Sequence, residues 1–157
     1  MRVSEVMAKE PTCCTPSCTA QRAAELMKQA GIGFLPVLEK FTRRLLGVVT
    51  DRDLSMRVIA EGRDPMHTAV RECMTTRLVC CDPEDDVWKA LDLMRDELVR
   101  RVLITDAQGD LQGVLSLSDL IRYTGIDGED ICDAIGKICE PGSMSGIQRA
   151  RALRKAS

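Results

Sequence analysis

The sequence predicts an α/β fold in which one small unit (β-α-β-β-α) occurs twice, its two copies packed through their sheets with pseudo-twofold symmetry. The first observation is a repeated pattern, in which Met7 matches Met74 and Val37 matches Ile104 at one offset of 67 residues. The second is that short apolar runs alternate with segments of helical periodicity. The third is size, because roughly 50 residues per unit cannot bury both faces of a three-stranded sheet. The two sheets should therefore cover each other.

Matching elements follow in the same order in both units. Leu26-Met27 corresponds to Leu93-Met94 at the offset of 67, and Gly47 corresponds to Gly113 at 66. Each unit starts with a short helix or turn, then has a strand closed by a proline turn, an amphipathic helix, two strands and a second helix. In the first unit we expect these at Val3–Met7, Thr12–Cys14, 19–30, Phe34–Leu38, Leu45–Thr50 and 51–61. In the second they are Val70–Met74, Leu78–Cys81, 86–97, Arg101–Thr105, Leu111–Ser116 and 117–124.

Three segments follow from this division. The first unit should span residues 1–62, and the linker and the second unit together should span residues 63–125. The remainder, 126–157, should hold a helix over 129–139 and a basic tail. That helix places three isoleucines on one side, and the tail is typical of a solvated or partner-contacting end.

Composition excludes several classes of protein. The formal net charge is −2, whereas a dedicated nucleic-acid binder is usually basic, so nucleic acid is not an expected partner. No apolar run approaches the roughly 18–20 residues that cross a bilayer. The first residues also lack the apolar core of a signal peptide. We therefore expect a soluble, cytoplasmic protein without membrane contact.

Eight cysteines raise the question of disulfides or metal. Cys13-Cys14 and Cys80-Cys81 are adjacent pairs in expected strands, where neighbours point to opposite faces. No pair has CxxC spacing, and the one histidine, His67, lies in the expected linker. Buried free thiols that pack as small apolar residues are the favoured interpretation, with no metal site. A redox or metal sensor built on these four cysteines is the minor alternative.

One motif occurs in both units where a strand turns into a helix. It is Thr50-x-x-Asp53 in the first unit and Ser116-x-x-Asp119 in the second. The unpaired N–H groups at a helix start suit an anion, and a nearby carboxylate can accept hydrogen bonds from ribose hydroxyls. The pair therefore suits a nucleotide. The same spacing is also that of a capping box, which only closes the helix start, so both interpretations stay open.

The duplicated unit resembles a pair of cystathionine β-synthase (CBS) domains, together called a Bateman module, over about residues 1–125. The resemblance rests on Glu5-Val6-Met7, Gly33 to Val37, Gly47 to Leu54 and, in the second unit, Glu72 to Thr75, Val99 to Val102 and Gly113 to Leu120. It implies a regulatory module that binds AMP, ADP, ATP or S-adenosylmethionine and signals to a partner protein. The second unit also resembles a repeat of the regulatory gamma subunit of AMP-activated protein kinase.

The resemblance also implies which residues bind the ligand. Phosphate and ribose should lie at the two hydroxyl-aspartate motifs, and the adenine against the first strand and the start of the second. The implied residues are Thr12, Cys14, Gly33, Phe34, Thr50, Arg52, Asp53, Leu78, Cys80, Arg100, Arg101, Ser116, Ser118 and Asp119. Arg100 and Arg101 would hold phosphate, or else form a solvated strand start or pair with Asp96 or Glu97. Phosphate charge in the first unit would come from Arg52 or from the loop at Arg43-Arg44.

Three functions are weighed against one another. A nucleotide-responsive regulatory module is favoured, and a structural dimerisation module without a ligand is the main alternative. An enzyme is not expected, since no nucleophile, base, metal cluster or Walker loop is present in the sequence. The family implies a homodimer that pairs through the second helices, Leu54–Ala60 and Leu117–Tyr123, and an effector protein that the sequence does not identify.

Overall fold

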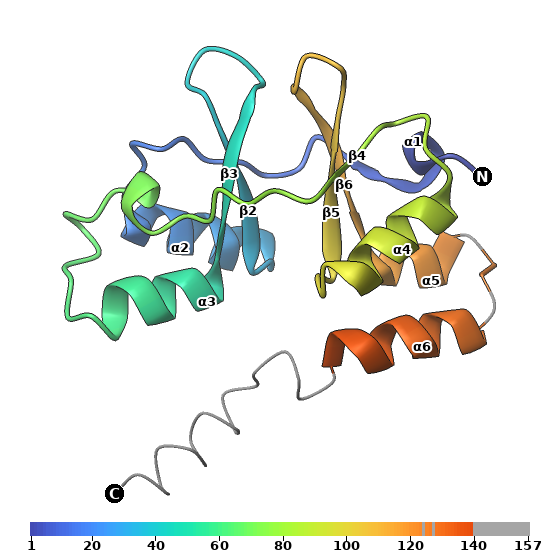
Figure 1. Ribbon diagram of the computed structural model, residues 1–157. Helices are drawn as coiled ribbons and strands as arrows, with labels where there is room; N and C mark the ends of the chain where they lie inside the picture. The colour runs from blue at the N-terminus through green and yellow to red at the C-terminus, as the bar shows by residue number, and fades with distance from the viewer. Residues whose placement is uncertain (124, 127, 140–157) are drawn as a thin grey trace, which may run out of the picture.

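Two repeats stand side by side in the computed structural model, which describes residues 1–123, 125–126 and 128–139 (Figure 1). Their strands lie in the middle of the molecule and their helices cover one side of it (Figure 1). The elements of the first repeat, with its leading segment, are α1 (Val3–Val6), β1 (Ala8–Lys9), α2 (Ala20–Ala30), β2 (Phe34–Leu38), β3 (Leu45–Thr50), α3 (Asp51–Leu54) and the π-helical turn η1 (Ser55–Ile59). Those that follow are the 3-10 turn η2 (Val70–Glu72), β4 (Cys80–Cys81), α4 (Val87–Asp96), β5 (Arg101–Thr105), β6 (Leu111–Ser116), α5 (Leu117–Tyr123) and α6 (Gly128–Cys139).

The sheets confirm the α/β architecture. β2 and β3 form an antiparallel pair in the first repeat, and the second repeat has the order β1-β6-β5-β4. The registers match, because Phe34 lies opposite Thr50 and Arg101 lies opposite Ser116. A shared cluster of Leu45, Leu103, Leu111 and Val114, with Phe34 and Val48 against it, packs the two sheets together.

Local sequence explains the main helices. α2 begins where the Thr19 hydroxyl accepts a hydrogen bond from the Arg22 N–H, and it ends at Gly31 in the left-handed conformation. Asp86 caps α4 in the same way by accepting from the Trp88 N–H. Each helix buries one apolar stripe, of which Ala23 and Met94 are examples.

The leading helix of each repeat packs on the other repeat. Val3 of α1 belongs to the apolar core of the second repeat, and the Val3 N–H donates to the Asp85 carbonyl at 2.9 Å. Val70 and Cys73, which lead into the second repeat, lie in the core of the first. Strand β1 continues this exchange by pairing with β6, and the connecting segment makes an isolated bridge between Thr75 and Val48.

The expected first strand at Thr12–Cys14 is wrong. Only Cys14 pairs, in an isolated parallel bridge with Val37. Its N–H donates to the Pro36 carbonyl, and its carbonyl accepts from the Leu38 N–H. Prolines at 11 and 16 cannot donate to a ladder, so the pairing stays this short.

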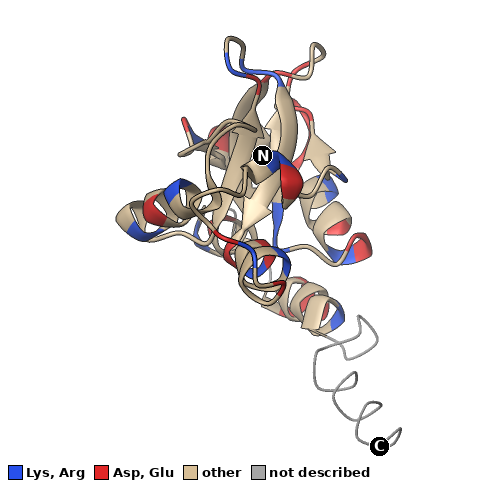
Figure 2. Ribbon diagram, turned by 90° about the vertical axis from the view of Figure 1, so that its left-hand side faces the viewer, with Lys and Arg blue, Asp and Glu red and all other residues tan. Residues whose placement is uncertain are grey.

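The two hairpin tips project together and carry opposite charge (Figure 2). The Arg43 guanidinium donates from Nε to the Leu111 carbonyl at 3.0 Å, and Arg44 forms a β-bridge with Asp110. The strands β2 and β3 separate this loop from Thr50, so the Arg43-Arg44 loop does not supply charge to the Thr50 motif. That part of the sequence-based interpretation is wrong.

Candidate functional site

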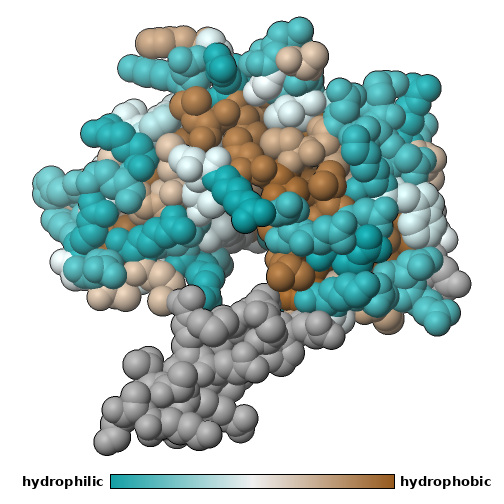
Figure 3. Space-filling model, viewed as in Figure 1, coloured by the Kyte–Doolittle hydropathy of each residue, from teal (hydrophilic) through white to brown (hydrophobic). Residues whose placement is uncertain are grey.

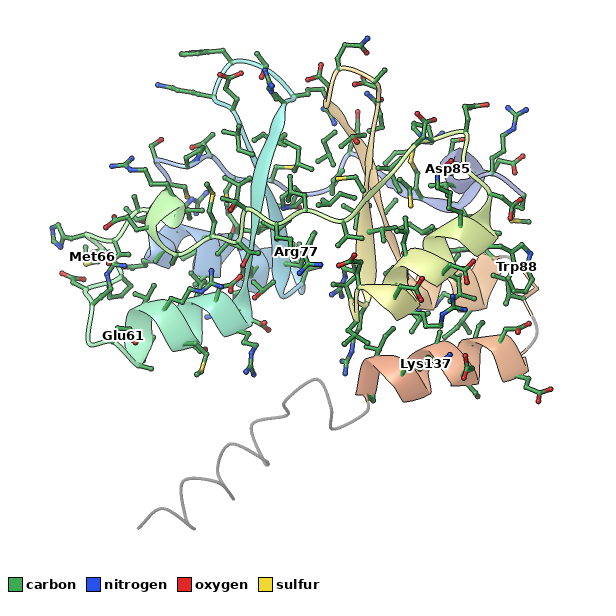
Figure 4. The ribbon with its side chains drawn as sticks, in the orientation of Figure 1. Glu61, Met66, Arg77, Asp85, Trp88 and Lys137 are labelled. Atoms are coloured by element: carbon green, nitrogen blue, oxygen red, sulfur yellow. The ribbon has the colours of Figure 1, made fainter. Side chains whose placement is uncertain are left out.

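A cleft of about 480 Å³ lies where the two repeats meet. Its walls come from the start of β2, the turn from β3 into α3, the connecting segment between the repeats, and the turn before β5. Apolar surface gathers along this junction (Figure 3). Arg77 of the connecting segment lies over it (Figure 4). The apolar part of the wall consists of Phe34, Val48, Leu78, Val79, Leu98, Val99 and Leu103.

Thr50 and Asp53 form a complete capping box at the edge of this cleft. The Thr50 hydroxyl accepts from the Asp53 N–H at 3.1 Å, and Oδ2 of Asp53 accepts from the Thr50 N–H at 3.0 Å. The other oxygen, Oδ1, lies 3.4 Å from Nη1 of Arg57, and the Asp53 side chain is 13% exposed. Both residues also line the cleft. The cap therefore fixes an alcohol and a carboxylate at the opening, and the capping and ligand-binding interpretations are compatible.

Gly33 lies beside this motif. The Asp51 N–H donates to the Gly33 carbonyl at 3.0 Å, which ties the start of β2 to the β3–α3 turn. A Cβ at Gly33 would lie 2.5 Å from Oδ2 of Asp51. Because the Asp51 side chain is exposed, it can turn away, so a larger residue at position 33 requires only a shift of that side chain.

Four arginines line the cleft, together with two aspartates. They are Arg52, Arg77, Arg100 and Arg101, against Asp51 and Asp53. The Arg101 guanidinium lies 5.7 Å from the centre of the Phe34 ring, so it reaches from the second repeat to the first. Arg77 pairs with Glu97, and Arg95 with Asp96, while Nη2 of Arg100 donates to Sγ of Cys139 at 3.7 Å. An apolar wall beside several guanidinium groups suits an aromatic anion.

The second motif has the same cap but different surroundings. The Ser116 N–H donates to Oδ2 of Asp119 at 2.9 Å. Ser116 and Ser118 line a hollow of about 440 Å³ with both Arg100 and Arg101, and α6 forms its other wall. Asp119 instead lines a separate hollow of about 570 Å³ with Met7 and Tyr123. The two motifs are therefore not equivalent sites.

The structure brings together only part of the implied set of residues. Gly33, Phe34, Thr50, Arg52, Asp53, Leu78, Arg100 and Arg101 share the cleft between the repeats. Thr12, Cys14 and Cys80 do not line it. Cys14 is buried in the core of the first repeat, and Cys80 is exposed on β4. Sequence reasoning missed Arg77 and Leu98, which also line the cleft. Arg77 directly precedes Leu78, and Leu98 lies two residues before Arg100, so their nearness in sequence to implied residues was a signal that could have found them.

The thiols of the described residues are all free. As expected for extended chain, Cys14 and Cys81 are buried while their neighbours Cys13 and Cys80 are less so. Burial raises the pKa of Cys14 to about 12 and that of Cys81 to about 11. Neutral, buried thiols pack as apolar groups. Within the described part of the chain no group of three or more His, Cys, Asp or Glu side chains is arranged to hold a metal ion.

These raised pKa values predict a loss of stability at alkaline pH. The ordinary pKa is 9.0, so between about pH 9 and 11 the unfolded chain releases thiol protons that the folded chain retains. The free energy of unfolding should therefore be highest below pH 9 and fall above it, by up to about 1.4 kcal/mol per pH unit for each thiol. Urea unfolding across this range would measure the slope. Cys14→Val should make this slope of unfolding free energy against pH shallower. An unchanged slope would contradict a raised pKa of Cys14.

Comparison with known proteins places the chain in a family. A family model for the CBS domain matches residues 3–59 and 70–125. CBS domain-containing protein YhcV of Bacillus subtilis is 40% identical over 118 residues, covering 75% of this chain and 81% of that protein. Hypoxic response protein 1 of Mycobacterium tuberculosis is 27% identical, covering 90% and 96%. The AMP complex of CBS domain protein PAE2072 from Pyrobaculum aerophilum superposes with a TM-score of 0.69 at 23% identity, covering 86% and 98%. With both repeats matched, the chain belongs to the CBS domain family as a tandem pair.

Proposed function

We propose that the chain is a regulatory, non-catalytic module that binds an adenosine nucleotide in the cleft between its repeats and signals occupancy to a partner protein. The observation that carries this proposal is the composition of the cleft. It joins the Thr50-Asp53 cap of one repeat with Arg100 and Arg101 of the other. A ligand that contacts both sides would favour one packing of the repeats over another, and only such a difference in affinity can transmit a signal.

Each part of an adenine nucleotide has a counterpart in the cleft. The apolar wall that includes Val79, Leu98 and Val99 offers a surface for the adenine ring. The Asp53 carboxylate can accept hydrogen bonds from ribose hydroxyls. The Thr50 hydroxyl donates to Oδ2 of Asp53 at 3.0 Å, and it can turn to donate to a phosphate oxygen instead. Arg100 and Arg101 supply charge-assisted hydrogen bonds to further phosphates.

Complexes of other CBS pairs support this choice of ligand. PAE2072 is described in complex with AMP, and the CBS pair of MJ0100 with 5-methylthioadenosine and S-adenosylmethionine. In the present cleft the excess of arginine over aspartate favours a multiply anionic ligand, so ADP or ATP should bind more tightly than the cationic S-adenosylmethionine.

No described helix is both long and apolar enough to cross a membrane. We place the module in the cytoplasm, where adenine nucleotides are abundant enough to act as a signal. The effector would recognise the packing of the repeats that the nucleotide favours.

Thermal unfolding with AMP, ADP, ATP and S-adenosylmethionine tests the proposal. A ligand that binds only the native state at one hundred times its Kd adds about 2.7 kcal/mol, which raises Tm by roughly 5–10 °C for a chain of this size. ATP or ADP should give the largest rise. An absence of any rise at millimolar nucleotide would contradict nucleotide binding.

The two aspartates provide matched variants. Asp53→Asn removes the carboxylate that lines the cleft, whereas Asp119→Asn removes its equivalent, which lines a different hollow. Both substitutions weaken a capping box, so both should lower Tm without nucleotide. Only Asp53→Asn should also abolish most of the nucleotide-induced rise. If both variants keep the full rise, the motif acts only as a cap, as in the structural alternative.

A further inference from the structure

The loop between β2 and β3 is one residue longer than its counterpart between β5 and β6. The bases of the two loops are joined by a symmetrical pair of hydrogen bonds. The Leu45 N–H donates to the Gly109 carbonyl at 3.1 Å, and the Leu111 N–H donates to the Arg43 carbonyl at 2.9 Å. The repeat offset is 67 where the loops begin and 66 at these hydrogen bonds, so the extra residue lies among residues 40–42.

Phe41 occupies the centre of this longer tip. Its side chain is 87% exposed, more than any other large apolar side chain among the described residues. It belongs to none of the three apolar clusters that the described residues form, so the packing of the fold does not require it. The tip of the second repeat carries Ala107 and Gln108 instead.

Hydrogen bonds within the loop hold this tip in one shape. The Thr42 hydroxyl donates to Oε2 of Glu39 at 2.7 Å and accepts from the Arg44 N–H at 3.1 Å. The Glu39 N–H donates to the Arg44 carbonyl at 3.0 Å. An aromatic side chain presented on an ordered loop has little conformational freedom left to lose when a partner binds it.

Three cations surround the ring. Nζ of Lys40 lies 5.2 Å from the centre of the Phe41 ring, and Arg43 and Arg44 follow in the same loop. None of the three forms an ion pair with any residue that the structure describes. Aromatic residues and arginine are typical of the side chains that carry most of the binding energy in protein interfaces. The tip therefore fits an apolar pocket bordered by carboxylates.

The second tip decides what kind of molecule carries such a pocket. Asp106 and Asp110 lie on it, and Arg44 forms a β-bridge with Asp110, so a basic and an acidic tip stand side by side (Figure 2). A surface covered with phosphates, such as an anionic membrane or a nucleic acid, would attract the first tip and repel the second. A second copy of the chain could offer its acidic tip, but Ala107 and Gln108 provide no apolar pocket for the ring. A protein surface can present both charges and a pocket.

We propose that the two hairpin tips are the docking surface for the effector protein, which seats Phe41 in an apolar pocket and sets Asp or Glu side chains against Lys40 and Arg43. The tips project on the side of the molecule away from the helices (Figure 1). A partner that covers both tips contacts both repeats, as a protein that responds to their packing must do. The identification of the partner as the effector rests on the proposed function. Docking itself needs no nucleotide, so the two proposals can fail separately.

Random peptides displayed on phage, selected on the full chain after depletion on Phe41→Ser, test the surface without nucleotide. The enriched peptides should combine Asp or Glu with an aromatic or aliphatic residue. Fluorescence anisotropy of a labelled enriched peptide then measures its Kd. Phe41→Ala should raise this Kd at least about 20-fold, and Lys40→Glu should raise it about tenfold. Added salt should weaken the binding to the wild type.

Met66→Ala is the matched control, because it removes another exposed apolar side chain far from the tips (Figure 4). It should leave the Kd of the peptide unchanged. Since Phe41 packs in no core, Phe41→Ala should also keep the Tm of the wild type, which separates lost binding from unfolding.

Four results would overturn the proposal. The first is that no peptide is enriched after depletion, and the second is that the enriched peptides lack carboxylates or bind Lys40→Glu as tightly as wild type. The third is Phe41-dependent cosedimentation with phosphatidylserine vesicles, which would assign the tip to a membrane surface. The fourth is a change of oligomeric state in Phe41→Ala by sedimentation velocity, which would assign it to a second copy of the chain.

Discussion

Replacing Gly113 by alanine should lower the free energy of unfolding by roughly 3 kcal/mol, the upper end of the cost of overpacking a filled site. A Cβ at this position would lie 2.8 Å from the Ala8 carbonyl oxygen and 2.8 Å from Sδ of Met7. The first contact is with backbone, which is held in place because Lys9 of β1 pairs with Gly113 of β6. The methyl group therefore has to push β1 away from the sheet.

The measurement is urea unfolding of Gly113→Ala beside a glycine that lacks such contacts. At Gly128, the first residue of α6, an added Cβ would meet no described atom within 4 Å, and the backbone is not left-handed. Gly128→Ala should therefore be neutral or stabilising, by at most about 1 kcal/mol. Equal effects of the two substitutions would mean that β1 does not cross the second repeat at Gly113.

The same close approach explains why both units have a glycine at this position. At Gly47 a Cβ would meet the Thr75 carbonyl oxygen at 2.9 Å, in the equivalent contact of the first repeat. The sequence showed that Gly47 and Gly113 correspond. It did not show that each glycine faces the leading segment of the other repeat. The offset between matching residues would be the same whether a leading segment packed against its own repeat or against the other one.

The four long strands could be predicted to the residue, as Leu45–Thr50 illustrates. Each is an apolar run bounded by turn or capping residues, so local sequence alone defines it. Short pairings such as Cys14 with Val37, or β1 with β6, depend on tertiary position, and no local pattern marks them.

The site could be predicted in part for a similar reason. Thr50 and Asp53 belong to a local motif, and their position at a strand end follows from it. Which residues face that motif is a property of the interface between the repeats. Arg101 of the second repeat reaches Phe34 across this interface, and Arg77 of the connecting segment lines the same cleft. Arg57 donates to the Cys73 and Met74 carbonyls and so ties the Thr50-Asp53 motif to the connecting segment. The second repeat has Tyr123 at the equivalent position, where it lines the hollow with Asp119.

The second large effect is expected for ATP binding when Arg100 and Arg101 are both replaced by alanine. Both guanidinium groups line the cleft, and hydrogen bonds to charged groups contribute about 1.5–3 kcal/mol each, so the double variant should bind ATP at least 100-fold more weakly. Isothermal titration calorimetry measures the Kd. The affinity of the wild type should also fall with added salt, and that of the variant should fall less.

Adenosine separates a phosphate-binding role from damage to the cleft. Because adenosine has no phosphate, its affinity should change only a few-fold in the double variant. Arg122→Ala, at an exposed arginine of α5 outside the cleft, removes one positive charge from the same repeat and should leave ATP binding within about twofold. If adenosine weakens in parallel with ATP, the arginines shape the cleft instead of holding phosphate. If neither ligand weakens, the nucleotide binds elsewhere, and the hollow beneath Asp119 becomes the next place to test.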